Sequence, residues 1–161
     1  MDKTAIVNAS PLIFLSRGRH AHILRHFASR ILVPEPVAEE IRRKGIYDVT
    51  FQILESTPWI EKVAAPPCPE SILEWGLGPG ESAVLALAYG YPEREAIIDD
   101  LAGRKCAAFH GIPVRGTLGL VLAAKRRGFI PKARPVMEIL LREGLYLSSE
   151  VLNRALKRVG E

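Results

Sequence analysis

Five polar side chains stand where a predicted strand or helix meets a loop, and their types could support metal chemistry. They are Asn8, Glu40, Glu81, Asp99 and Asp100. The asparagine and the two aspartates each follow a short apolar run, and side chains at strand ends in an α/β protein point into the crevice where ligands bind. Carboxylates gathered in one crevice repel each other, and a divalent cation relieves that repulsion. Oxygen ligands with few His or Cys side chains suit Mg²⁺ or Mn²⁺.

Each of these residues also has a purely structural interpretation. The two glutamates fall in predicted first turns of helices, where the helix dipole favours an acidic side chain. Of the two aspartates, we expect one to cap the following helix and the other to bind a ligand. Asn8 is a common turn residue, although Ser10 and Pro11 already provide a helix start at that point. The pattern alone leaves open whether Asn8 is functional and whether Asp99 or Asp100 is the main ligand.

The elements that must position these residues alternate between short apolar strands and helices. We predict strands at residues 4–7, 31–33, 59–63, 96–99 and 113–114, the third at a sheet edge. We predict helices at residues 11–27, 37–44, 81–88, 103–109, 118–127, 134–142 and 148–159, while residues 46–58 stay ambiguous. This alternation predicts an α/β protein with a parallel sheet covered on both faces. The 161 residues favour one domain over 1–161, with the helices at about 134–159 packed on it.

Composition excludes several classes of protein. No apolar run reaches the roughly 18 residues of a membrane span, and a strand follows the first residues directly, so we expect neither a membrane segment nor a signal peptide. Cys68 and Cys106 are far apart without a CxxC spacing, which favours reduced thiols and a cytoplasmic location. The net charge of +4 is compatible with nucleic acid as a partner without being specific for it. Fingerprints of nucleotide-triphosphate, dinucleotide and α/β-hydrolase sites are missing from the sequence.

Taken together, five segments resemble the PIN domain family, in the bacterial and archaeal branch long described as a domain of unknown function. The matching segments are residues 7–13, 33–41, 80–88, 98–100 with Arg104 and Ala107, and 116–119 with 124–125. Their combined order covers nearly the whole chain and is more specific than any single segment. The resemblance implies a three-layer α/β/α sandwich with a central parallel sheet. It also implies the ancestry of a metal-dependent ribonuclease, often the toxin of a toxin–antitoxin pair.

The resemblance also implies roles for particular residues. The catalytic and metal-binding positions are Asn8, Glu40, Glu81 and one of Asp99 or Asp100, holding Mg²⁺ or Mn²⁺. The neighbours that would hydrogen-bond the site are Ser10 and Thr117, and the residues that would hold the nucleic-acid backbone are Arg104, Lys125 and Arg126. PIN nucleases typically carry Asp where this chain has Asn8. An amide oxygen still ligates a hard cation but brings no charge.

These observations lead to one expected function and one alternative. The expected function is a metal-dependent ribonuclease of PIN type, the toxin of a toxin–antitoxin pair, with RNA as substrate, an antitoxin protein as partner and a homodimeric assembly. The alternative is a catalytically weakened PIN-like module that binds nucleic acid or a protein partner. Asn8 is the residue that separates the two, because it removes a negative charge from the site.

Overall fold

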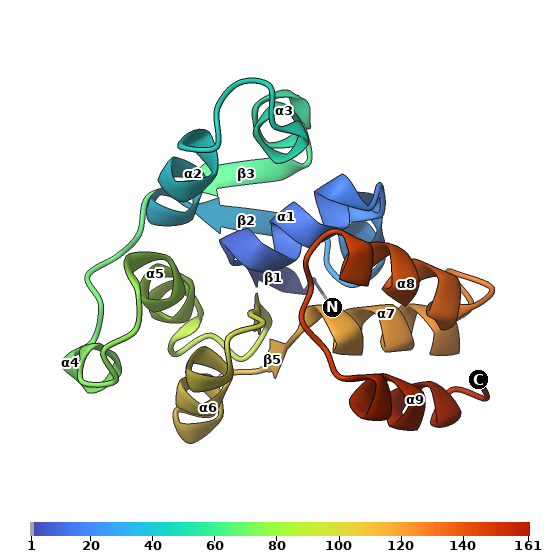
Figure 1. Cartoon of the computed structure of the whole chain (residues 1–161). Helices are drawn as coiled ribbons and strands as arrows, with labels where there is room; N and C mark the ends of the chain where they lie inside the picture. Colours follow the sequence, from blue (N-terminus) through green and yellow to red (C-terminus); the bar gives the residue numbers. More distant parts are fainter. Residues whose placement is uncertain (1) are drawn as a thin grey trace.

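The centre of the fold is a five-stranded sheet in which every strand pair is parallel. A computed structural model describes residues 2–161, and its strand order is β3-β2-β1-β4-β5 (Figure 1). The strands are β1 (Thr4–Val7), β2 (Arg30–Pro34), β3 (Ile60–Val63), β4 (Arg94–Ile97) and β5 (Val114–Arg115). Of the three inner strands, β1 and β2 are largely apolar and buried, whereas β4 begins with two half-buried charged residues and is buried in its second half. Such strands require helices on both faces of the sheet.

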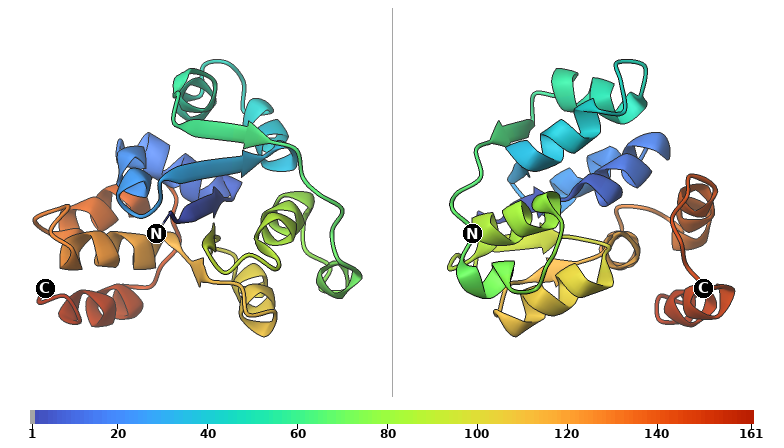
Figure 2. Two further views of the ribbon diagram at one scale, coloured as in Figure 1. Left: turned by 180° about the vertical axis from the view of Figure 1, so that it is seen from behind. Right: turned by 60° about the vertical axis from the view of Figure 1, so that its left-hand side comes forward.

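Helices flank this sheet and complete the expected three-layer α/β/α sandwich. They are α1 (Ala9–Arg17), η1 (Ala21–His26), α2 (Glu35–Arg42), α3 (Val49–Ser56), α4 (Glu70–Leu73), α5 (Pro79–Ala88), α6 (Leu101–Phe109), α7 (Thr117–Arg126), α8 (Ala133–Arg142) and α9 (Ser149–Lys157). The further views in Figure 2 place α4 and α9 at opposite ends of the molecule. Across residues 2–161, no helix combines the length and apolar character needed to cross a membrane.

Strand order brings the ends of β1 and β4 together. Val7 pairs with Ile97 in the parallel register, and the backbone N–H of Asn8 donates to the carbonyl of Ile97 at 3.0 Å. The chain runs from β1 toward β3 on one side and places β4 and β5 on the other. The crevice for ligands in an open α/β sheet lies outside the carboxyl ends of strands at such a reversal. Asn8 and Asp99 are therefore brought to the same edge of the sheet.

The predicted continuous helix over residues 11–27 is wrong. Helix α1 already begins at Ala9 and ends at Arg17, and the chain then continues as the 3₁₀-helix η1. Arg19 adopts a left-handed backbone with φ of 62°. Gly18 lies under α8, because a Cβ atom added there would be 2.8 Å from Leu140 Cδ2. The close approach of a distant helix, which local periodicity cannot report, explains why this position is a glycine at the end of α1.

Two segments without a predicted structure are helical. The ambiguous stretch 46–58 contains α3, which begins where Asp48 accepts a hydrogen bond from the Thr50 N–H at 2.8 Å. That side-chain cap supplies an acceptor for a backbone N–H that the helix itself leaves unpaired. The short helix α4 follows the proline-rich connection after β3. The edge position predicted for residues 59–63 is confirmed, because β3 is the last strand on its side of the sheet.

Candidate active site

Asn8 has the most unusual surroundings of the five predicted site residues. It occupies the position before α1, but its side chain makes no capping hydrogen bond. The residue is only 3% exposed. Its Nδ2 donates to Glu81 Oε1 at 3.3 Å, whereas its Oδ1 is buried and has no partner within residues 2–161. A buried acceptor without a partner costs about 1–3 kcal/mol, so this oxygen is suited to a bound ion or water.

Glu40 and Glu81 meet at Gly80. The two glutamates line a cavity of about 220 Å³ between α2 and the start of α5. A Cβ atom placed on Gly80 would lie 3.1 Å from Asn8 Oδ1 and 3.7 Å from Glu40 Oε2. The unpartnered oxygen and the Glu40 carboxylate therefore border the same small volume. Any side chain larger than glycine at position 80 would enter it.

Local sequence explains how the two glutamates are held. Glu40 follows the buried residues Val37 and Ala38 of α2 and precedes buried Ile41, so it lies at the margin of the packed face. Glu81 lies in the first turn of α5, a helix whose following residues are all buried. An acidic side chain there is favoured by the helix dipole. The buried helix faces fix the backbone of both glutamates, and their carboxyl groups project where the two helices meet.

The two aspartates after β4 have separate structural partners. Asp100 Oδ2 accepts from the Gly103 N–H at 2.8 Å and so caps α6, which confirms that one aspartate is a cap. Asp99 accepts from the Thr117 N–H and from its hydroxyl, each at 2.7 Å. Asp99 thereby fixes the beginning of α7.

Asp100 and Glu81 lie beside the same glycine, Gly103. A Cβ atom on Gly103 would lie 3.5 Å from Asp100 Oδ2 and 3.8 Å from Glu81 Cγ. Asn8, Glu40, Glu81 and Asp100 are thus linked by shared neighbours, at Gly80 on one side and Gly103 on the other. Within the described part of the chain, no three His, Cys, Asp or Glu side chains are grouped tightly enough to hold a metal ion. A cation here would depend on the Asn8 oxygen, and the metal-binding and catalytic roles stay predictions.

The predicted neighbouring and backbone-binding residues lie in different surroundings. Ser10 is exposed in the first turn of α1, whereas Thr117 is buried against Asp99. Arg104 and Asp99 both lie beside Gly116. A Cβ atom added to this glycine would be 3.3 Å from Arg104 Nη1 and 3.1 Å from Asp99 Oδ1. The Lys125 ammonium is paired with Glu161 at 3.1 Å, and Arg126 is exposed. Their role in binding nucleic acid stays a prediction.

Some residues of the site had little signal in the sequence. Gly78 and Gly80 make room for the carboxylates, since a Cβ on Gly78 would lie 2.7 Å from Glu81 Oε2. The sequence shows Gly-Pro-Gly as a glycine-rich entry to α5, which begins at its proline, but the role of the glycines depends on the side chains that approach them. Arg43 also lines the cavity and adds a positive charge. It stands in a basic run at the end of α2, where the helix dipole alone accounts for cations.

Comparison with known protein families identifies the family of the chain. A family model described as a PIN domain matches residues 4–161 of the chain. No curated protein gives a significant match. The five-stranded parallel sheet with its flanking helices is the fold expected for that family. The chain therefore belongs to the PIN domain family, a family of nuclease type whose members generally use divalent metal ions.

Proposed function

We propose that this protein is a divalent-metal-dependent endoribonuclease whose cation is held by Asn8, Glu40, Glu81 and Asp100. The observation that carries the proposal is the buried Asn8 Oδ1, which has no partner and borders the same volume as the Glu40 carboxylate. An oxygen-only set of donors is what Mg²⁺ and Mn²⁺ prefer. Membership of the PIN domain family supports the same cofactor class.

When bound, the cation would activate a water and stabilise negative charge on the scissile phosphate. The residues of the chain have distinct tasks around it. The Asn8 amide N–H holds one oxygen of Glu81, so the asparagine both orients a carboxylate and offers an oxygen. Asp100 uses one oxygen to cap α6 and keeps the other for a ligand. Asp99 is a positioning residue, because its carboxylate holds Thr117 at the start of α7.

Positive charge for the phosphate is available on two sides. Arg43 lines the cavity together with the glutamates, and Arg104 lies beside Asp99 at Gly116. Arginine contacts to phosphate oxygens hold the backbone without reading its sequence. We therefore expect cleavage with little sequence preference around the scissile bond, because the same backbone atoms occur at every nucleotide.

The direct test is cleavage of a fluorophore-labelled RNA by the wild-type protein with Mn²⁺ or Mg²⁺, and again with EDTA. We expect cleavage that EDTA abolishes. Glu40→Gln should lower the rate at least about a hundredfold, which corresponds to about 2.7 kcal/mol of transition-state stabilisation. Glu138→Gln is the matched control, because Glu138 is an exposed glutamate on α8. Cleavage that persists in EDTA, or equal losses in both variants, would contradict the proposed site.

The alternative function is a PIN-like module that binds nucleic acid or a protein partner without cleaving RNA. Two observations favour it: the neutral Asn8, and the lack of a tight group of three metal-binding side chains among residues 2–161. Oligonucleotide binding without cleavage at any Mn²⁺ concentration would support this alternative. Appearance of cleavage in an Asn8→Asp variant would then identify the missing charge as the cause.

The proposed biological setting is the cytoplasm, with the protein acting as the toxin of a toxin–antitoxin pair, as a homodimer and with an antitoxin protein as partner. Membership of the PIN domain family supports the nucleic-acid-binding part of these proposals. Induced expression in a bacterial host should arrest growth, and Glu40→Gln should relieve the arrest. Sedimentation of the purified protein should give the mass of a dimer. Normal growth or a monomeric mass would count against the corresponding proposal.

A further inference from the structure

A groove lined by arginines lies next to the candidate active site. It has a volume of about 430 Å³ and runs between β5 with the first half of α7 on one side and α9 on the other. Leu118 and Leu122 of α7 and Val151 of α9 supply its apolar lining. Its charged lining residues are Arg104, Arg115, Arg154 and Arg158, and no acidic residue lines it. Figure 1 shows α9 alongside α7, at the end of the molecule opposite α4.

The positive charge of this groove is only partly neutralised. Arg115 pairs with Glu95 at 3.4 Å and Arg154 with Glu150 at 2.8 Å. Within residues 2–161, neither Arg104 nor Arg158 forms an ion pair. Arg115 Nη1 is buried and has no acceptor in the described part of the chain. The Arg115 guanidinium also lies over the Phe27 ring, 5.0 Å from its centroid. The charge of the groove that no carboxylate of residues 2–161 balances is therefore that of Arg104 and Arg158.

The charge continues along α7 beyond the groove. A second hollow of about 400 Å³ shares Arg115 and Gly119 with the first and adds Arg126 and Arg127. The two hollows form one track of arginines that follows the helix over most of its length. No acidic residue lines the second hollow either. A continuous line of like charges fits a polymer that carries one charge in every repeating unit.

The track begins at the candidate active site. Gly116 lies between Asp99 and Arg104, and a Cβ atom there would be 3.1 Å from the carboxylate and 3.3 Å from the guanidinium. Asp99 also holds Thr117, the first residue of α7. A strand bound in the groove therefore reaches the end of β4, where Asp99 is followed directly by Asp100, the cap of α6.

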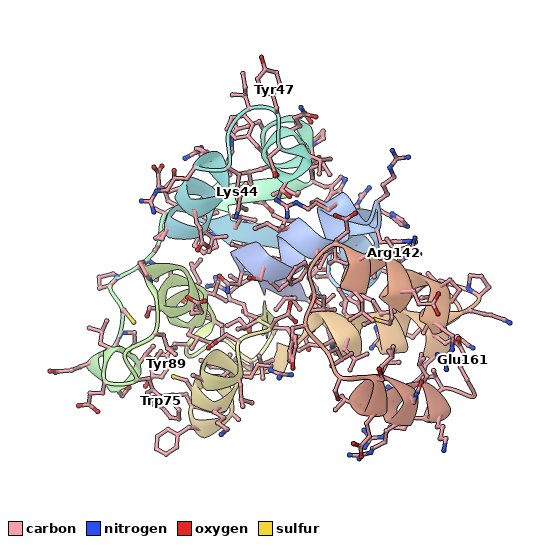
Figure 3. All side chains as sticks on the ribbon, viewed as in Figure 1. Lys44, Tyr47, Trp75, Tyr89, Arg142 and Glu161 are labelled. Carbon is pink, nitrogen blue, oxygen red and sulfur yellow. The ribbon has the colours of Figure 1, made fainter. Side chains whose placement is uncertain are left out.

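Helix α9 is held firmly enough to serve as one wall of the groove. Glu161, just beyond α9, accepts hydrogen bonds from the Ala133 and Arg134 N–H groups at 2.6 and 3.0 Å. The same carboxylate pairs with Lys125 of α7 at 3.1 Å. Figure 3 shows Glu161 at the end of the molecule formed by α7, α8 and α9. These contacts join α9 to both neighbouring helices, so the wall exists before a ligand binds.

We propose that this arginine groove, walled by α9, binds the phosphodiester backbone of several nucleotides on one side of the cleavage site. The inference rests on the proposed function, since it extends the path of the RNA away from the candidate active site. The lining of both hollows lacks aromatic residues. A groove without such stacking platforms holds the backbone by charge and gives little sequence preference. An acidic peptide is the competing ligand, but the continuity with the candidate active site favours nucleic acid.

The test is a binding titration in EDTA, so that cleavage does not interfere. The probe is a fluorescent single-stranded RNA of about twelve nucleotides, within the range covered by one backbone-tracking groove. The variant is Arg154→Gln with Arg158→Gln, both on or beside α9. The matched control is Lys44→Gln with Arg142→Gln, which removes the same charge at exposed positions labelled in Figure 3. Melting curves confirm that both proteins are folded.

We expect the groove variant to bind the RNA about tenfold more weakly than the control at moderate salt. Its plot of log affinity against log salt should be flatter by about 1.4, because each lost phosphate contact on a single strand contributes about 0.7. A dinucleotide probe should show a much smaller difference. Equal affinity and equal salt slopes in the two variants would overturn the proposal.

Two further outcomes distinguish RNA binding in the groove from peptide binding there and from the proposed nuclease function. Arginine-dependent binding of an acidic Glu- and Leu-containing peptide, with unchanged RNA binding, would overturn the proposal and make the groove a protein-binding site. Failure of the wild-type protein to cleave any RNA would remove the proposed nuclease function. The groove would still stand in that case, provided that the binding difference in EDTA is found.

Discussion

The replacement Asn8→Asp tests the candidate active site most directly. It keeps the shape of a side chain that is 3% exposed and exchanges a neutral amide for a carboxylate. In the wild type, Asn8 Nδ2 donates to Glu81 Oε1 at 3.3 Å. The substitution turns that hydrogen bond into a contact between two carboxylates. Without metal, the variant should be less stable than the wild type.

The magnitude follows from the distance. Two unit charges 3.3 Å apart at an effective dielectric constant of about 20 repel by about 5 kcal/mol. The pair can instead take up one proton, and protonating a carboxyl of ordinary pKa near 3.9 at pH 7 costs about 4 kcal/mol. The lower figure limits the penalty, so we expect a loss of up to about 4 kcal/mol in the free energy of unfolding at pH 7.

The sign of the pH dependence is fixed by the same reasoning. The repulsion raises the pKa of the shared proton in the folded state above its value in the unfolded chain. The penalty should therefore be near zero below about pH 3.5 and should grow as the pH rises above that, because only then does folding require an extra proton. In Mn²⁺ the added charge faces a cation, and the penalty should shrink or reverse.

Urea unfolding of the wild type and Asn8→Asp, in EDTA and in Mn²⁺ at several pH values, measures these effects. Mn²⁺ at about a hundredfold excess over its dissociation constant adds about 2.7 kcal/mol to a protein that binds it only when folded. We expect a larger gain for the variant than for the wild type. A pH-independent penalty, or an equal Mn²⁺ gain in both proteins, would refute the proposal that position 8 faces both Glu81 and the cation.

Two further substitutions test neighbouring parts of the structure. Gly80→Ala places a methyl group 3.1 Å from Asn8 Oδ1 and 3.7 Å from Glu40 Oε2, so Mn²⁺ should no longer stabilise the protein. Its stability in EDTA should fall by at most about 1 kcal/mol, because alanine favours the helix, and unchanged Mn²⁺ stabilisation would exclude a cation at this point. Glu161→Gln weakens the hydrogen bonds from Ala133 and Arg134 and the pairing with Lys125, which lower the pKa of Glu161 from 4.5 to about 2. The variant should lose about 1–2 kcal/mol of stability at pH 7. The difference in stability between wild type and variant should vanish as the pH falls from about 4.5 to about 2, because the wild-type carboxylate is then protonated. A difference that stays constant over that window would contradict the assigned contacts.

Most of the fold follows from local patterns in the sequence. Short apolar strands predict a parallel sheet, because strands buried on both faces need apolar residues at nearly every position. Helices α5, α7 and α8 lie within a few residues of their predicted bounds, since their apolar stripes and flanking glycines or prolines mark the ends. The prediction failed at residues 18–26, where the approach of α8 to Gly18 accompanies the end of α1.

The sequence by itself determined which chemical groups are available: oxygen donors at the ends of strands and helices, and arginines near helix ends. Tertiary structure decided how each group is used. Asn8 and Glu81 are 73 positions apart, yet their side chains are hydrogen-bonded. Asp99 accepts a hydrogen bond from the Thr117 hydroxyl, whereas the adjacent Asp100 caps α6. The role of a polar atom depends on which partners lie within about 3 Å of it, and distances between remote segments are fixed only when strands pair and helices pack.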